Sequence, residues 1–200
     1  MFFSTRPVRW LNEPEHHVAD DALSLTTRAG TDLWQRTYYG FRRNNAHAVL
    51  TAVTDQYFTF TATAEFDYSR RFDQCGVIIH QDAENWFKAS SEHERAGLQR
   101  LGSVVTNGGW SDWATTDLPD DVHEISYRLS RRERDFRIEW ALPGGAFHQM
   151  RILHLAAATG PVDLGVYACS PEDGSFTARF TDIGLGGCLW EPHGPAAGGA

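Results

Sequence analysis

The chain has 200 residues, of which 42% are hydrophobic and 22% charged, a composition typical of one globular domain. Its net charge is −8 and no basic run is longer than Arg131–Arg132, so we expect no binding to nucleic acid. No apolar stretch approaches the roughly 20 residues needed to cross a bilayer. The segment MFFSTRPVRWLNEP at the start does not contain the basic and apolar regions of a signal peptide.

The cysteines indicate a reducing environment. Cys75, Cys169 and Cys188 are widely spaced, odd in number and without a CxxC pair. This usage is typical of buried thiols rather than of a disulfide framework or a zinc site. Since signal and membrane segments are not expected either, we predict a cytoplasmic protein that makes no contact with a membrane.

Alternation of apolar and polar residues with a period of two runs through most of the chain. From Tyr57 to Asp67, for example, every second residue from Phe58 onward is apolar. The segment Arg131–Arg134 is predicted to be a charged hairpin turn between two strands. The predicted strands, in chain order, are at residues 22–28, 31–38, 46–54, 57–67, 73–81, 85–93, 98–106, 124–129, 135–142, 147–155, 162–169 and 175–184.

Turn-forming residues separate these segments, as at Asn107-Gly108-Gly109, Pro143-Gly144-Gly145 and Gly160-Pro161. No segment carries a helical stripe of apolar residues. About a dozen short strands at this spacing predict an all-β sandwich or barrel. We expect a single domain over residues 1–188, followed by a flexible tail over residues 189–200 that ends in GPAAGGA.

Several segments, in their order along the chain, are similar to those of a known family. They are WLNEP at residues 10–14, TDLWQRTYYGF at 31–41, FDQCG at 72–76, ENWFK at 84–88 followed by Glu92, SVVT at 103–106, SDW at 111–113 and GVYACSP at 165–171. Together they resemble the DUF1349 family, whose members include the fungal "regulation of enolase" protein. The resemblance covers about residues 6–185, and no single segment carries it alone.

The resemblance implies a concanavalin A-like jelly-roll sandwich of two curved antiparallel sheets. It also implies kinship with the accessory sandwich domain of some β-xylosidases. It implies no activity, because the family is defined by a domain of unknown function. Family members usually carry a glycine and an aliphatic residue between the lysine and the glutamate, where this chain has Ser90 and Ser91. This departure predicts a more polar strand end.

The strand over residues 86–92 is the first candidate for a functional surface. Alternation places Trp86, Lys88, Ser90 and Glu92 on one face. Lys88 is the only lysine of the chain. Unpaired charges are costly to bury, so this face is not an ordinary core. It is either a solvated face with a Lys–Glu pair, or the lining of the concave groove that jelly rolls use for ligands.

Neighbouring segments favour the groove. In residues 31–39, alternation places aromatic and charged residues together on one side, and residues 73–74 and 111–113 add compact polar groups. A sugar site needs an aromatic platform beside planar hydrogen-bonding groups. We therefore predict a site for a carbohydrate or related polyhydroxy ligand. Its predicted residues are Trp34, Arg36, Gln74, Trp86, Lys88, Glu92, Asp112 and Trp113.

The sequence favours binding over catalysis. Retaining glycosidases of related jelly rolls use an ExDxxE strand motif, but this chain has Glu65 and Asp67 followed by Arg70 in place of the third acid. No GxSxG elbow supports a serine triad, and no glycine-rich turn precedes a helix. His80 and His93 are conceivable metal ligands, but they lack HxH or HExxH spacing. We predict no catalytic residue, metal or cofactor.

Three hypotheses for function follow. The first is a groove that binds a saccharide without strong catalysis. The second is a glycoside hydrolase or lyase with Glu92 as the acid/base and Lys88 tuning its pKa. The third is a cytoplasmic regulator that contacts a protein partner through a sheet face.

Overall fold

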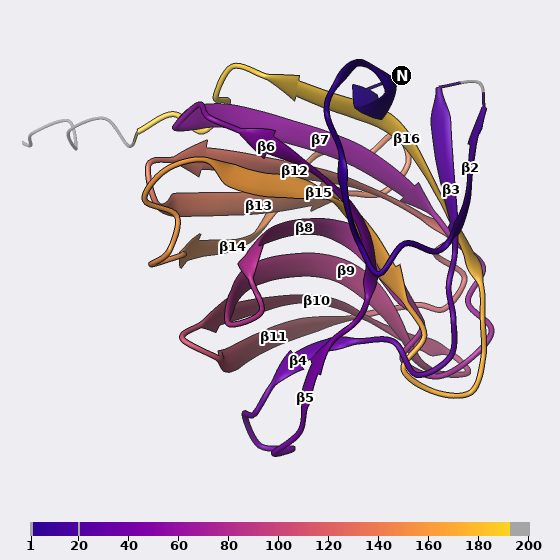
Figure 1. The fold of residues 1–200 in the computed structure, drawn as a ribbon. Helices are drawn as coiled ribbons and strands as arrows, with labels where there is room; N and C mark the ends of the chain where they lie inside the picture. Colours follow the sequence, from indigo (N-terminus) through magenta and orange to yellow (C-terminus); the bar gives the residue numbers. More distant parts are fainter. Residues whose placement is uncertain (1, 20, 193–200) are drawn as a thin grey trace, which may run out of the picture.

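Two seven-stranded antiparallel sheets pack face to face in the computed structural model of the chain, which describes residues 2–19 and 21–192 (Figure 1). The first sheet contains, in spatial order, β1 (Arg9–Leu11), β6 (His47–Val53), β15 (Val162–Cys169), β8 (Gln74–Asp82), β9 (Asn85–Arg95), β10 (Leu98–Asn107) and β11 (Trp110–Leu118). The second contains β14 (His148–His154), β13 (Asp135–Ala141), β12 (Glu124–Arg132), β7 (Tyr57–Glu65), β16 (Thr177–Gly186), β3 (Ala22–Thr26) and β2 (Glu15–Ala19). The predicted all-β jelly-roll sandwich is confirmed.

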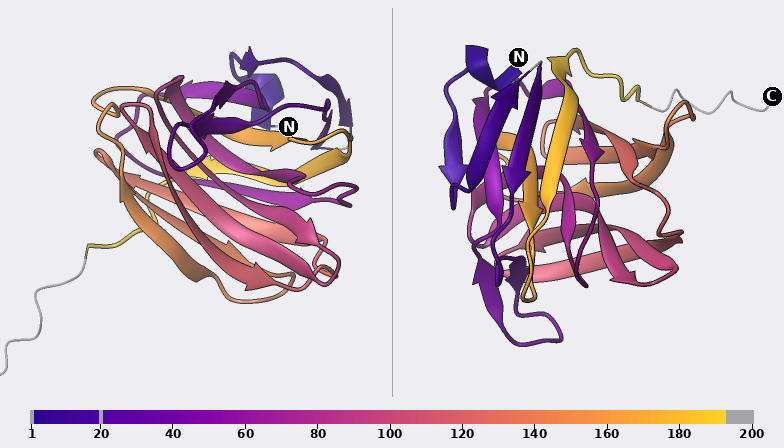
Figure 2. Two further views of the ribbon diagram at one scale, coloured as in Figure 1. Left: turned by 90° about the horizontal axis from the view of Figure 1, so that it is seen from below. Right: turned by 90° about the vertical axis from the view of Figure 1, so that its right-hand side faces the viewer.

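Two small elements complete the fold. A short hairpin of β4 (Leu33–Gln35) and β5 (Arg42–Asn44) forms a separate two-stranded sheet, and a 3-10 helix, η1 (Phe2–Thr5), precedes β1. Figure 2 shows the two main layers from two further sides, with β2 and β3 beside β16 at one edge. In residues 2–19 and 21–192, no helix is both long and apolar enough to span a membrane.

The alternation in β7 shows why this sequence forms a sandwich. Its inward-facing residues, among them Phe58 and Phe60, are buried in the core between the sheets. Its other face carries threonines, and Thr59 bonds the hydroxyl of Ser130 on β12 at 2.8 Å. Such cross-strand hydroxyl pairs hold two strands in register on the face that is not part of the core.

Some elements differ from those predicted. The strand expected over residues 31–38 ends at Gln35, because Arg36 and Tyr38 have φ angles of 57° and 61° in the left-handed region. Strands β1, β2, β5 and β11 were not predicted. β11 is an edge strand in which most side chains are exposed, so its sequence WSDWATTDL carries little apolar alternation.

The predicted charged turn over Arg131–Arg134 is shorter than expected. Strand β12 runs on through Arg132, and the turn itself contains Glu133 and Arg134. The Arg131 side chain is fully buried. Its guanidinium donates hydrogen bonds to the carbonyl oxygens of Glu133 at 2.6 Å, Asp55 at 3.2 Å, Ala158 at 3.1 Å and Gly160 at 2.8 Å.

This arginine therefore joins three loops at one end of the sandwich, because its planar fork satisfies several carbonyls at once. The predicted tail lies nearby in part. Leu189 N donates to Thr59 Oγ1 at 2.8 Å, and Arg132 donates to the carbonyl of Trp190 at 2.8 Å. Residues 193–200 of the predicted tail lie outside the described residues.

Replacing Arg131 with alanine is expected to lower the free energy of unfolding by about 3 kcal/mol or more, because it leaves buried carbonyls without donors and opens a cavity. Urea denaturation followed by circular dichroism measures the loss. The neighbouring Arg134→Ala is the control, because Arg134 is exposed and its loss should change stability by about 0.5 kcal/mol at most. Equal stability of the two variants would contradict this role.

Candidate functional site

A segment that we term the strap, residues 27–46, covers part of the outer face of the first sheet. Figure 1 shows β8, β9 and β10 as arches, with the β4–β5 hairpin of the strap beneath them. Leu33 and Trp34 of the strap pack against Trp86, Ile78 and other outward-facing residues in a second apolar cluster, separate from the core between the sheets. The strap thus fills one part of this face.

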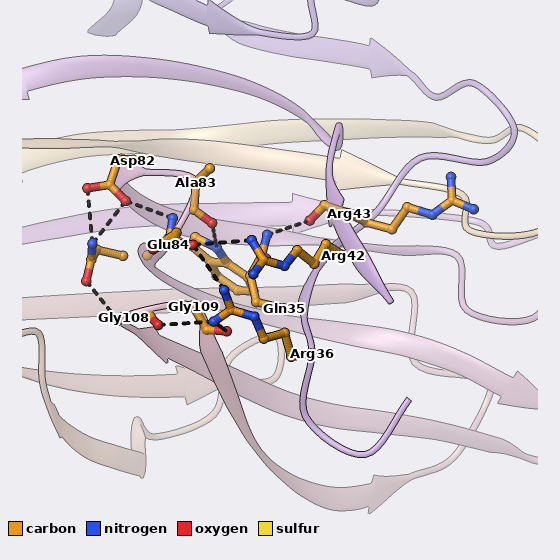
Figure 3. Close-up of polar contacts among 11 residues, drawn as sticks. Gln35, Arg36, Arg42, Arg43, Asp82, Ala83, Glu84, Gly108 and Gly109 are labelled. Carbon is orange, nitrogen blue, oxygen red and sulfur yellow. Dashed lines mark hydrogen bonds and ion pairs between the residues drawn. The ribbon is translucent and has the colours of Figure 1, made fainter. Parts of the chain in front are cut away.

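Polar contacts hold the strap in place at two points. Near its start, Thr31 N donates to the carbonyl of Ser170 at 3.1 Å, and Ser170 N donates to Thr31 Oγ1 at 3.0 Å. In the β4–β5 hairpin, Arg36 donates to the carbonyl of Gly109 at 3.0 Å and pairs with Glu84 at 3.4 Å (Figure 3). Because both points are anchored on the first sheet or its loops, the part of the strap between them keeps a set position over the sheet.

The strap and the sheet together enclose a pocket of about 420 Å³. Small-molecule sites are typically concave spaces of roughly 300–1,000 Å³ with mostly apolar walls and a few placed polar groups. β8, β9, β10 and β11 supply one wall, the strap another, and residues 171–172 part of the rim. The lining residues are Gly30, Asp32, Trp34, Tyr39, Phe41, Arg43, Phe72, Gln74, Lys88, Ser90, Glu92, Arg100, Gly102, Ser103, Val104, Trp113, Pro171 and Glu172.

Aromatic rings form one wall of this pocket. Trp34 lies edge-on to Trp113, with ring centroids 6.3 Å apart, and edge-on to Tyr39 at 5.3 Å. Trp113 is 39% exposed, so part of its ring is open to a ligand. Gly102 makes room for it, since a Cβ on Gly102 would lie 2.9 Å from Trp113 Nε1. The indole therefore crosses β10 at a position that only glycine permits without displacement.

A hydrogen-bonded chain of side chains forms the floor. Lys88 Nζ donates to Gln74 Oε1 at 2.8 Å and lies 3.5 Å from Asp32 Oδ1. Tyr167 OH also donates to Gln74 Oε1, at 3.1 Å. The amide nitrogen of Gln74 then donates to Glu92 Oε2 at 2.7 Å. Because two donors point at its oxygen, the Gln74 amide is held in one orientation, with its nitrogen toward Glu92.

Glu92 has the most perturbed acidity in this pocket. Burial of the carboxyl raises its pKa to about 8. The Lys88 ammonium acts in the opposite direction, and the charge of Asp32 adds to the increase in pKa. At neutral pH the Glu92 side chain is therefore mostly a neutral carboxylic acid, which can donate a hydrogen bond as well as accept one.

Five of the eight predicted site residues lie together in the pocket. They are Trp34, Gln74, Lys88, Glu92 and Trp113. The face shared by Lys88, Ser90 and Glu92 is thus not a solvated surface, since the Lys88 side chain is only 5% exposed. Their role in binding a ligand stays a prediction.

The other three predicted residues do not line the pocket. Arg36 is bound to Glu84 and Gly109 and anchors the strap. Trp86 shares the face of Lys88, as predicted, but the strap covers it fully. Asp112 points away from the pocket and pairs with Arg151 of β14 at 2.8 Å.

Sequence reasoning missed Tyr39 and Phe41, which line the pocket from the strap hairpin. Alternation assigned Tyr39 to the opposite side from Trp34, but the left-handed residues Arg36 and Tyr38 break the strand and turn the chain. The density of aromatic residues in TYYGF was the available signal. Asp32 was also missed as a site residue, although alternation in residues 31–39 places it on the same side as Trp34.

The other chemistry considered from sequence lies elsewhere. Glu65, of the incomplete glycosidase motif, pairs with Arg179 on the second sheet, and Asp67 is exposed outside the pocket. His80 is buried and contacts Asn44 at 3.2 Å. Within residues 2–19 and 21–192, no group of three or more His, Cys, Asp or Glu residues is placed to hold a metal ion.

The sequence model of a family described as "Protein of unknown function (DUF1349)" matches residues 10–188 of the chain. The chain belongs to the DUF1349 family. A relative of the chain, "Regulation of enolase protein 1" of Saccharomyces cerevisiae, is 29% identical over 177 residues, which cover 88% of this chain and 87% of the relative. The resemblance inferred from the scattered sequence segments is therefore confirmed.

Solved structures place this DUF1349 protein among known sandwiches. A functionally unknown protein from Saccharomyces cerevisiae superposes with a TM-score of 0.84 at 27% identity, covering 92% of this chain and 97% of the other. A GH43 protein of Bacillus licheniformis reaches 0.64 at 13% identity, covering 83% of this chain and 33% of the other. The carbohydrate-binding module CBM66 from Bacillus subtilis reaches 0.56 at 13% identity, covering 90% and 96%. The last two likenesses are of fold alone.

The raised pKa of Glu92 predicts how the stability of this DUF1349 protein depends on pH. An acid whose pKa is higher in the folded state destabilises the fold as pH rises from the unfolded value of 4.5 to about 8. The slope is about 1.4 kcal/mol per pH unit for one such group. Glu92→Gln should remove this contribution, so its stability relative to wild type should increase between pH 5 and pH 8 in urea denaturation. A constant difference would contradict the assignment.

Proposed function

We propose that the pocket binds a carbohydrate or a related polyhydroxy compound and does not turn it over efficiently. The observation that carries the proposal is the pairing of an aromatic wall, Trp34 and Trp113, with the polar floor of Gln74, Lys88 and Glu92. A sugar ring has an apolar face of C–H groups and an edge of hydroxyl groups. An aromatic ring beside planar hydrogen-bonding groups complements both.

Two structural neighbours support this choice of ligand class. CBM66 is, by its name, a carbohydrate-binding module, and it shares the sandwich fold over nearly its whole length. The GH43 protein matches through a third of its chain. Fold alone does not establish function, so the proposal rests on the pocket.

We also propose that the protein works in the cytoplasm and binds neither nucleic acid nor a membrane. Its three cysteines are free, and Cys75 and Cys169 are buried, as reduced thiols usually are. The yeast relative is named for the regulation of enolase. A protein partner captured by this chain, and lost when surface residues outside the pocket are changed, would favour a regulatory contact over sugar binding.

Removing the aromatic wall should weaken sugar binding. In a glycan array followed by tryptophan-fluorescence titration, Trp113→Ala should bind the best saccharide at least about tenfold more weakly, because stacking on the ring is lost. Gly102→Ala should weaken binding through displacement of the indole while the Trp113 side chain is kept.

Trp190→Ala is the control, because Trp190 lies outside the pocket lining and its ring contacts Arg137 of the second sheet. It should bind as the wild type does. Failure of every saccharide to bind the wild type, or equal affinity of Trp113→Ala and Trp190→Ala, would refute the proposal.

The carboxyl groups of Glu92 and Asp32 in the pocket favour a second candidate function, cleavage of a glycosidic bond. Glycosidases use one protonated acid and one ionised carboxylate on the two sides of the bond. Burial keeps Glu92 protonated at neutral pH, and Asp32 lies close enough for its charge to raise the Glu92 pKa further. The pocket thus contains an acid and a second carboxyl without the ExDxxE motif.

Turnover of nitrophenyl glycosides tests this second candidate. If Glu92 is a general acid, the wild type should release nitrophenol and Glu92→Gln should reduce the rate by a factor of about 100 or more. Asp67→Asn, outside the pocket, should leave the rate unchanged. Equal background rates in all three proteins would leave binding as the function of the pocket.

A further inference from the structure

The charge on the floor of the pocket bears on which ligands it accepts. Lys88 is the only cation of the floor, and its ammonium is directed at Gln74 and Asp32 with a side chain only 5% exposed. Its charge is matched by the Asp32 carboxylate, and the Gln74 oxygen occupies a second N–H group. The floor therefore offers no unpaired cation, although it contains the single lysine of the chain.

The two oxygens of Glu92 have different surroundings. Oε2 accepts the hydrogen bond from Gln74 at 2.7 Å. Among the hydrogen bonds of residues 2–19 and 21–192, none involves Oε1. Because the Gln74 amide is held by Lys88 and Tyr167, it cannot rotate to offer its oxygen to Glu92. The proton of a neutral Glu92 belongs on Oε1, which is left for a ligand.

The raised pKa of Glu92 indicates that a negative charge is unfavourable at the floor of the pocket. Burial raises its pKa to about 8 even though Lys88 is nearby, and Asp32 raises it further. A ligand carboxylate or phosphate seated beside Glu92 would meet the same loss of solvation and the same repulsion from Asp32. A ligand hydroxyl would meet neither.

Two arginines near Glu92 are paired with acids. Arg100, the cross-strand neighbour of Glu92 on β10, pairs with Asp117. Arg71 pairs with Glu94. Arg43 lines the pocket from the strap and donates to the carbonyl of Gly30 at 3.5 Å. The cations nearest Glu92, namely Lys88, Arg71 and Arg100, are therefore each matched by a carboxylate.

We propose that the pocket selects uncharged polyhydroxy ligands over their anionic counterparts, with the Glu92 carboxyl donating a hydrogen bond to a ligand hydroxyl and the Asp32 carboxylate accepting one. This inference rests on the proposed function and specifies its ligand class. It makes binding depend on a proton that the protein itself holds. Affinity for a neutral sugar should fall as Glu92 ionises, because the donor becomes a second anion.

Titration calorimetry with matched sugars tests the selection. Glucose with glucuronic acid, galactose with galacturonic acid, and cellobiose with cellobiouronic acid differ in one group, which is a hydroxymethyl in the neutral sugar and a carboxylate in the acidic one. At pH 7 the neutral member of a pair that binds should do so at least about tenfold more tightly than the acidic member. An acidic sugar that binds as tightly as its neutral counterpart would overturn the selection.

The pH profile tests the role of Glu92. Between pH 7 and pH 9.5, the affinity of the wild type for the neutral sugar should fall by about 30-fold, because each pH unit above the pKa reduces the protonated fraction tenfold. Glu92→Gln should give a flat profile, because its amide can accept from Gln74 and still donate to the ligand. Asp67→Asn, at an exposed acid outside the pocket lining, should keep the wild-type profile.

The outcomes separate the two proposals. A flat profile in the wild type, or a Glu92→Gln profile as steep as that of the wild type, overturns the role of Glu92 while sugar binding stands. Absence of binding by every sugar at every pH refutes the proposed function, and this inference with it.

Discussion

The packing of the strap against the outer face of the first sheet is the interaction on which the pocket depends. Without it, Trp86 and Ile78 would be exposed on a sheet face, and Lys88 would reach solvent. With it, the face is divided into a filled apolar part and an open part. The contacts of Arg36 with Glu84 and Gly109 hold this division at one end. The pocket is therefore a space between two segments that are distant in sequence.

Burying charge beneath the strap determines the chemistry of the pocket floor. A lone ammonium in such a place would be too costly, so Lys88 is matched by Asp32 and by the amide of Gln74. Gln74 has its oxygen occupied and passes a hydrogen bond on to Glu92. One buried cation thus orients an amide, and the amide decides which carboxyl oxygen faces the ligand space. The buried charge of Arg131 is matched in a similar way, by carbonyl groups. Because these carbonyls belong to different loops, Arg131 holds the loops together.

Sequence alternation predicted strands well where one face is core and the other is not. β7 has this character, and its apolar face was predicted correctly. It did not predict β11, because an exposed edge strand has no apolar side to reveal its period. It also misplaced Tyr39, because left-handed φ angles at Arg36 and Tyr38, neither of them a glycine, end the extended pattern before Gly40. Trp86 and Glu92 share a face in the sequence pattern and in the structure, but the strap covers only Trp86.

The sequence by itself determined the all-β architecture, the family, and the shared face of Lys88, Ser90 and Glu92, because alternation and local motifs depend on neighbours along the chain. Only the tertiary structure decided which members of that face are open. Contacts between the strap and the sheet join residues some 50 positions apart, such as Asp32 with Lys88 and Arg36 with Glu84. Burial, which raises the pKa of Glu92 and removes Trp86 from solvent, is a property of that assembly and of no local pattern.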